Sequence, residues 1–91
     1  MKADTKKLAA QRLARIEGQV RGITKMVEDG RYCIDVVRQV QAVKAALTGL
    51  EGVVLKDHLE TCVEHALASP DLDARREKVE ELVAVLGGRK K

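Results

Sequence analysis

The sequence predicts an all-α protein, and three observations support that prediction. Helix-favouring residues are abundant, and the 91 residues include a single Pro. Two long stretches carry apolar residues at alternating steps of three and four, the spacing of helices that pack along a seam. Tyr32 is the only aromatic residue, so a small monomeric core would lack the large rings that usually supply buried area. We therefore expect one domain, residues 1–91, whose helices pack on helices, in part between subunits.

The first helix is expected from Leu8 to Glu28, after a polar and basic arm over residues 1–7. Asp29 and Gly30 then predict a helix stop, with Gly30 in the left-handed conformation that ends many helices. The polar face is rich in cations, which are either simply solvated or contact phosphate groups. The predicted apolar seam consists of Leu13, Ile16, Val20, Ile23 and Val27.

A second, longer helix is predicted from near Cys33 to about Leu67. Gly49 and Gly52 either loosen its middle or break it into two helices, and we favour one helix. Its apolar seam consists of Val36, Val40, Val43, Leu47, Leu50 and Val54.

A third helix is predicted to begin at Ser69 and to run to about Leu86. Ser69 is suited to the N-cap and Pro70 to the first helical position. Asp71 and Asp73 would then lie in the first turn, where the helix dipole favours negative charge.

Charge and composition narrow the class of partner. The net charge is +3 and the isoelectric point about 9.0, which is a mild excess of positive charge for one chain. In an oligomer the charges of the subunits add, which makes nucleic acid a plausible partner. Two cysteines without a signal peptide indicate cytosolic thiols rather than a disulfide framework. No apolar run reaches the length of a membrane span, so we expect a cytoplasmic protein without a membrane partner.

Both cysteines and one histidine could share a metal ion. His58 and Cys62 are four residues apart, so on a helix they project from one side on successive turns. Cys33 comes much earlier, and one continuous helix would separate it from His58 by roughly 37 Å. Either the chain folds back, or Cys33 meets the pair from a different subunit, and we favour the second.

Two thiolates and one imidazole form a soft donor set that suits Cu(I) or Zn. A structural zinc site needs four ligands, so three favour an open zinc site or three-coordinate Cu(I). His65 lies near the same face and could be a fourth ligand, although a partly exposed polar role is favoured. Each residue also has an ordinary interpretation: Cys33 as a small buried hydrophobic residue, and His58 as a surface histidine.

An enzyme is not expected. A Cys–His pair can serve nucleophilic catalysis. However, the chain has no Gly-rich loop and no evident oxyanion site, and three short helices leave little room for a substrate pocket.

Three ordered segments resemble the copper-sensitive operon repressors, the CsoR/RcnR family, over nearly the whole chain. The resemblance implies an all-α protomer of three helices that forms an antiparallel helical dimer and assembles as a dimer of dimers. It also implies a repressor that binds operator DNA without a helix-turn-helix and is released by an inducer, which de-represses efflux or detoxification genes. The segments are Arg15-Ile16-Glu17-Gly18-Gln19-Val20-Arg21-Gly22, Arg31-Tyr32-Cys33-Ile34-Asp35-Val36 and His58-Leu59-x-x-Cys62-Val63.

Carried over by position, the resemblance places the metal ligands at Cys33 of one protomer and at His58 and Cys62 of the other. This set is similar to that of the Cu(I) sensors. Nickel and cobalt sensors have an N-terminal His and a His in the third position, which is Cys62 here. Persulfide sensors lack the His, and formaldehyde sensors lack the second Cys, so His58 and Cys62 argue against those branches.

The resemblance also implies two outer partners of the metal site. A Tyr just before the first Cys corresponds to Tyr32, whose alternative role is that of a lone packing aromatic. A Glu on the third helix would hydrogen-bond the distal nitrogen of His58 and orient its ring. We assign it to Glu81, with Glu77 and Glu80 as competitors.

The expected function is a Cu(I)-responsive transcriptional repressor whose first-helix cations contact DNA phosphates. A sulfur sensor, another inducer of the same family, or a copper-buffering protein without a DNA role remain alternatives. The DNA-binding residues are expected to be Arg12 and Arg15, then Lys7 and Arg21, with Arg38 and Lys44 as weaker candidates.

Overall fold

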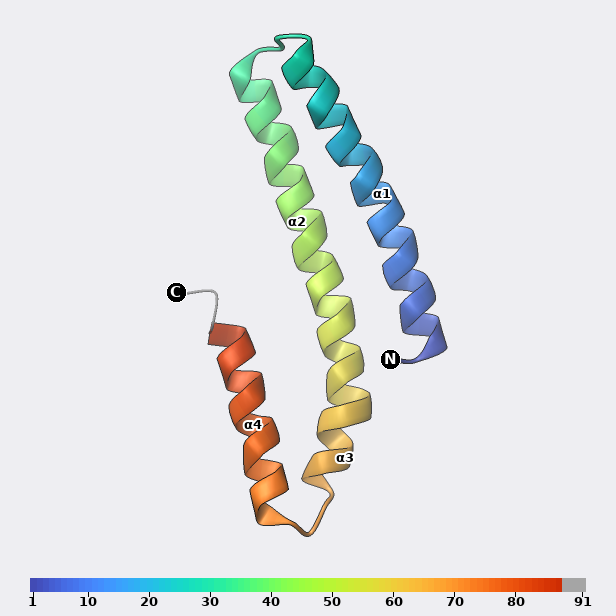
Figure 1. The fold of residues 1–91 in the computed structure, drawn as a ribbon, viewed down its shortest axis with the longest axis vertical. Coiled ribbons are helices and arrows are strands. Elements are labelled where there is room, and N and C mark those ends of the chain that lie inside the picture. Colours follow the sequence, from blue (N-terminus) through green and yellow to red (C-terminus); the bar gives the residue numbers. More distant parts are fainter. Residues whose placement is uncertain (88–91) are drawn as a thin grey trace. The chain divides into compact units, whose positions relative to one another are not determined.

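The computed structural model describes residues 1–87, apart from the side chain of Val63. It contains helices and no strand over that range, which confirms the all-α class (Figure 1). None of the helices described is both long enough and apolar enough to cross a membrane. The chain divides into two compact units, Met1–Leu55 and Lys56–Lys91. In order, the elements are α1 (Ala3–Glu28), α2 (Cys33–His58), the π-helical segment η1 (Leu59–Val63), α3 (Glu64–Leu67) and α4 (Leu72–Gly87).

The first unit is a helical hairpin of α1 and most of α2, whose axes run in opposite directions (Figure 1). Gly30 has φ +68° at the end of α1, as the sequence predicts. Its N–H donates to the carbonyl of Val27 at 3.1 Å, and the N–H of Arg31 donates to that of Met26 at 2.9 Å. These two bonds make a Schellman turn, which satisfies the last carbonyls of α1 and reverses the chain.

The expected N-terminal arm is largely wrong, because α1 already begins at Ala3. The N–H of Lys6 donates to the carbonyl of Lys2 at 3.0 Å, which closes the first turn. Asp4 lies in that turn, where it stabilises the positive end of the helix dipole. Lys6 and Lys7 therefore belong to the helix surface, whereas Lys2 is the N-cap residue.

The predicted seam of α1 divides into two rows. Ile16 is buried and Ile23 half-buried, whereas Leu13, Val20 and Val27 are exposed. One row therefore faces the inside of the hairpin, and the other is left uncovered within the described chain.

The seam of α2 divides in the same way. Val43 is buried, with half-buried Val36 and Leu50 one heptad on either side of it, whereas Val40 and Leu47 are exposed. α2 also runs unbroken through Gly49 and Gly52, so the two-helix alternative is excluded. Helical structure continues to Leu67, as predicted, but through η1 and α3.

The start of α4 differs from the prediction by a few residues. Asp71, rather than Ser69, caps the helix: its Oδ1 accepts from the N–H of Asp73 at 3.0 Å and from that of Ala74 at 3.4 Å. Ser69 Oγ instead accepts from the N–H of Asp71 at 3.1 Å. Ser69 therefore stabilises the turn before α4, and Asp71 accepts hydrogen bonds from the free amides of its first turn.

Candidate metal centre and nucleic-acid face

His58 and Cys62 lie where regular helix gives way to η1. His58 is the last residue of α2 and is half-buried, and Cys62 lies within η1 as an exposed free thiol. Hydrogen bonds in a π segment reach five residues along the chain, so each turn is wider than an α-turn. The step of four residues from His58 to Cys62 stays within about one such turn, which leaves a nitrogen and a sulfur donor at this end of α2.

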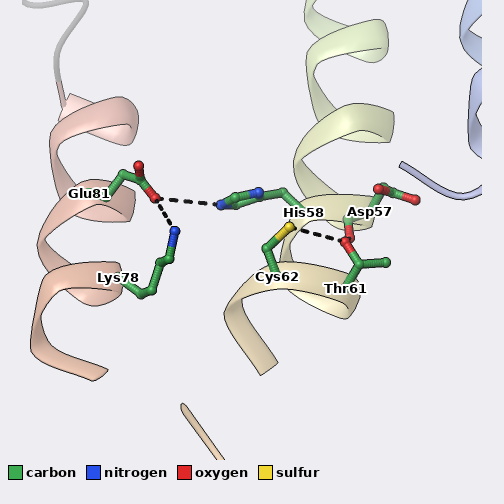
Figure 2. A network of polar contacts seen from close by, with 6 residues as sticks. All are labelled: Asp57, His58, Thr61, Cys62, Lys78 and Glu81. Atoms are coloured by element: carbon green, nitrogen blue, oxygen red, sulfur yellow. Dashed lines mark hydrogen bonds and ion pairs between the residues drawn. The ribbon is translucent and has the colours of Figure 1, made fainter. Parts of the chain in front are cut away.

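Glu81 of α4 lies beside the imidazole. Its Oε1 is 3.8 Å from His58 Nε2 and 3.5 Å from Lys78 Nζ. Figure 2 shows both side chains pointing at this carboxylate. Since Nε2 faces Glu81, Nδ1 is the ring nitrogen left for a metal, and a carboxylate on the other nitrogen is the usual way to orient a metal-binding histidine.

The other candidate glutamates do not contact this ring within the described chain. Glu77 and Glu80 are exposed on α4, and neither has a contact to His58 in the part of the chain described. Of the three, Glu81 is therefore the glutamate that approaches His58, although 3.8 Å is longer than the expected hydrogen bond, and its role in a metal site stays a prediction.

Cys33 is the first residue of α2, and its thiol is exposed and free. Because α2 is continuous from Cys33 to His58, roughly 37 Å of helix separates them. Among the described residues of one chain, no three His, Cys, Asp or Glu side chains are grouped to hold a metal ion. A single chain thus presents a two-donor half-site at one end of α2 and a lone thiol at the other.

The remaining candidates are near these ends. Tyr32 is exposed, and its carbonyl accepts from the N–H groups of Asp35 at 3.0 Å and Val36 at 3.2 Å, which starts α2 directly beside Cys33. His65 is exposed on α3. Neither observation assigns a metal-binding role to these side chains.

The candidate DNA-contacting cations are exposed on α1, but they do not share one face. With 3.6 residues per turn, Lys7, Arg15 and Arg21 fall within an arc of about 120° opposite the buried Ile16. Arg12 lies only about 40° from Ile16 by the same geometry. Its Nη1 would be 3.2 Å from a Cβ at Gly49, so its guanidinium lies against α2.

Sequence reasoning missed three features of the candidate metal centre. The π segment leaves no recognised pattern in the sequence. Lys78 is three residues before Glu81, a spacing that helix periodicity could have flagged as an ion pair. Thr61 bonds the carbonyl of Asp57 at 2.8 Å and contacts Cys62 Sγ at 3.5 Å (Figure 2).

Proteins named as copper-sensing transcriptional repressors are similar to this chain. RicR, a copper-sensing transcriptional repressor of Mycobacterium tuberculosis, is 43% identical over 85% of this chain and 82% of its own length. CsoR, a copper-sensing transcriptional repressor of Bacillus subtilis, is 52% identical over 66% of this chain, and the match spans 59% of that protein.

Two solved structures share the fold. The crystal structure of the copper-sensing repressor CsoR with Cu(I) from Geobacillus thermodenitrificans superposes with a TM-score of 0.87 at 37% identity and covers 100% of this chain and 92% of its own. A variant of the formaldehyde-responsive regulator FrmR from Salmonella enterica superposes with a TM-score of 0.75 at 28% identity and covers 96% of each chain.

The sequence profile of one family matches nearly all of the described chain. It covers residues 5–87 and is that of the metal-sensitive transcriptional repressors. Proteins of this kind regulate transcription and are not enzymes, in agreement with the sequence analysis. This match, the two similar repressors and the shared all-α fold establish that the chain belongs to the metal-sensitive transcriptional repressor family.

Proposed function

We propose that this protein is a Cu(I)-responsive transcriptional repressor. Without copper it binds operator DNA, and Cu(I) releases it, so that genes of copper efflux or resistance are expressed. The observation that carries the proposal is the half-site of His58 and Cys62, with Glu81 at 3.8 Å from His58 Nε2. The relatives RicR and CsoR are named copper-sensing repressors, and CsoR has been crystallised with Cu(I).

The metal site is completed between two subunits. One chain offers His58 and Cys62 together, while its own Cys33 is at the far end of a continuous helix. Two antiparallel copies of α2 would bring the partner subunit's Cys33 to this half-site. The uncovered rows of α1 and α2, among them Val20, Val27, Val40 and Leu47, supply apolar surface for such an assembly.

The donor types fit Cu(I). Two thiolates and an imidazole are soft ligands, and three of them suit the low coordination number of Cu(I). When bound, the metal would supply a cross-link between the start of one α2 and the end of its partner. His65, exposed on α3, is left outside the site.

DNA contact is proposed for the cations of α1. Lys7, Arg15 and Arg21 lie on the face opposite the hairpin interior and can contact phosphates directly. The guanidinium of Arg12 lies beside Gly49, so its side chain would have to change conformation before it could contact DNA. The assembly is a homotetramer built as a dimer of dimers, in which residues 1–91 act as one domain. As a regulator of transcription it works in the cytoplasm, where bacterial DNA lies.

Release follows from differential binding. Copper favours the quaternary arrangement in which both helix ends meet at the site, and DNA favours the arrangement in which the basic faces of α1 match its backbone. Linkage requires that DNA weaken copper binding by the same factor by which copper weakens DNA binding.

The metal assignment is tested by Cu(I) titration against a competing chelator. Cys33→Ala, His58→Ala and Cys62→Ala should each lose tight binding of one Cu(I) per protomer. His65→Ala is the matched control, a nearby exposed histidine whose removal should leave the affinity unchanged. Tight binding retained in all three ligand variants would place the site elsewhere.

The regulatory assignment is tested by an operator shift assay with Cu(I), Zn(II), Ni(II), polysulfide and formaldehyde. Cu(I) alone should release the DNA. Release by polysulfide, with a sulfur link between the two cysteines in the mass spectrum, would establish the sulfur-sensing alternative. Copper binding without any operator shift would indicate a buffering protein.

A further inference from the structure

The inference concerns Thr61, which lies between the two ligands of the half-site. Thr24, Thr48 and Thr61 each donate their hydroxyl proton to the carbonyl four residues earlier. Thr24 and Thr48 do so at 3.1 Å from exposed positions in regular α-helix. Thr61 does so at 2.8 Å, is partly buried, and lies within η1. Only the last of these three bonds therefore joins regular helix to the π segment.

This bond acts on the backbone that separates His58 from Cys62. At the end of η1, the N–H of Glu64 bonds to the carbonyl of Leu59, five residues earlier. A side chain that bonds into the carbonyl ladder is a recognised cause of local helix bending, and π segments concentrate at functional sites. The Thr61 hydroxyl reaches back to the carbonyl of Asp57, the residue just before His58. It thus connects the turn that carries one ligand with the turn that carries the other.

The same oxygen contacts the second ligand directly. Thr61 Oγ1 is 3.5 Å from Cys62 Sγ. A hydroxyl has one proton, and a backbone carbonyl can only accept a hydrogen bond. Thr61 therefore donates its only hydroxyl proton to the carbonyl of Asp57. In the contact with Cys62 the oxygen is then the acceptor and the thiol the donor. Figure 2 shows the sulfur beside this hydroxyl.

We propose that Thr61 is a positioning residue of the metal site, whose hydroxyl, through its bond to the carbonyl of Asp57, holds the π segment that carries Cys62 in the geometry that receives the metal. The inference rests on the proposed function, because it assigns a role at the same site. It predicts that the hydroxyl, rather than the bulk of the side chain, is the part that matters.

The test compares four proteins as full chains. Thr61→Val removes the hydroxyl and keeps the shape, and Thr61→Ser restores a hydroxyl. Thr48→Val removes an equivalent bond from regular α-helix and is the matched control. Each is measured for Cu(I) affinity by chelator competition and, without metal, for hydrogen exchange of the amides of residues 59–64.

Thr61→Val should lower the Cu(I) affinity about tenfold, as is typical when the outer partner of a metal ligand is lost. It should also speed amide exchange in residues 59–64 of the metal-free protein. Thr61→Ser should restore both values, and Thr48→Val should change neither. Thr61→Ala, a stronger helix former, replaces the valine variant if that protein loses its helical circular dichroism signal.

The inference is overturned if Thr61→Val, or the alanine variant in its place, binds Cu(I) within twofold of the wild type. It is also overturned if the serine variant fails to restore affinity or if Thr48→Val weakens binding equally. These outcomes differ from failure of the proposed function, in which the wild-type protein itself would bind no Cu(I). If the wild type binds no Cu(I), hydrogen exchange still tests the role of the hydroxyl. Amides of residues 59–64 that exchange at the same rate in Thr61→Val and in the wild type would refute it.

Discussion

Replacing Glu81 by Gln tests whether the carboxylate beside His58 belongs to the metal site. The substitution keeps the size and an acceptor oxygen but removes the negative charge. In the structure Oε1 of Glu81 is 3.8 Å from His58 Nε2, beyond an ordinary neutral hydrogen bond, so charge is the main part of the contact. Glu81→Gln should therefore weaken Cu(I) binding without removing a ligand.

The size of the effect follows from distance and solvent. The side chain of His58 is 36% exposed and that of Glu81 54%, so water screens the pair. A metal-binding imidazole is neutral and offers Glu81 the dipole of its N–H group, so the interaction of two unit charges at this separation in water, about 1 kcal/mol, is an upper limit. Lys78 Nζ, at 3.5 Å, already neutralises part of the carboxylate. About 1 kcal/mol corresponds to about a fivefold loss of Cu(I) affinity, which is the largest effect we expect in this setting.

The assay is competition with a Cu(I) chelator at fixed pH and protein concentration. Glu80→Gln and Glu77→Gln are matched controls, because both remove the same charge from exposed positions of α4 that do not contact His58 within the described chain. The reasoning is refuted if Glu81→Gln binds Cu(I) as tightly as the wild type, or if either control loses as much affinity. A loss far above tenfold would show that the assembled site buries the pair.

Three further predictions follow from the fold and from the basic face of α1. Arg15→Ala should weaken operator binding at every salt concentration and lower the slope of log affinity against log salt by about 1, as measured by fluorescence anisotropy; an unchanged slope would remove Arg15 from the phosphate contacts. Gly30→Ala should destabilise the protein by about 1 to 2 kcal/mol in urea denaturation, because φ is +68° there; equal stability would mean that the turn rearranges. Asp71→Ala should cost about 1 kcal/mol in the same assay and Ser69→Ala less, since Asp71 caps the two free amides; the reverse order would restore Ser69 as the cap.

The positions of most helices could be predicted because their signals are local. Gly30 stops α1 where its left-handed conformation is needed, and the steps of three and four mark both long helices. The predicted start of α1, Leu8, is five residues later than the observed start, Ala3, because polar residues at a helix end show no apolar period. The cap of α4 moved from Ser69 to Asp71 because two adjacent capping residues cannot be ranked without the backbone geometry.

The candidate site was predictable in its residue types and less so in its geometry. If Cys33 and His58 share a metal, thiol and imidazole chemistry and the length of the predicted helix favour their coming from different chains, and the continuous α2 is compatible with that prediction. Which glutamate approaches His58 depends on how α4 lies beside the end of α2, and no periodicity within α4 separates Glu77, Glu80 and Glu81.

The sequence by itself determined the helical class, the rows of apolar residues and the soft donor set, because each depends on residue type and spacing along one chain. Only the tertiary structure decided which row of each seam is buried, that Arg12 turns to Gly49, that Thr61 contacts Cys62 and that Glu81 approaches His58. These features depend on contacts between separate turns and helices. Such contacts are set by side-chain packing and by the local π segment. No spacing of residue types along the sequence predicts either of them.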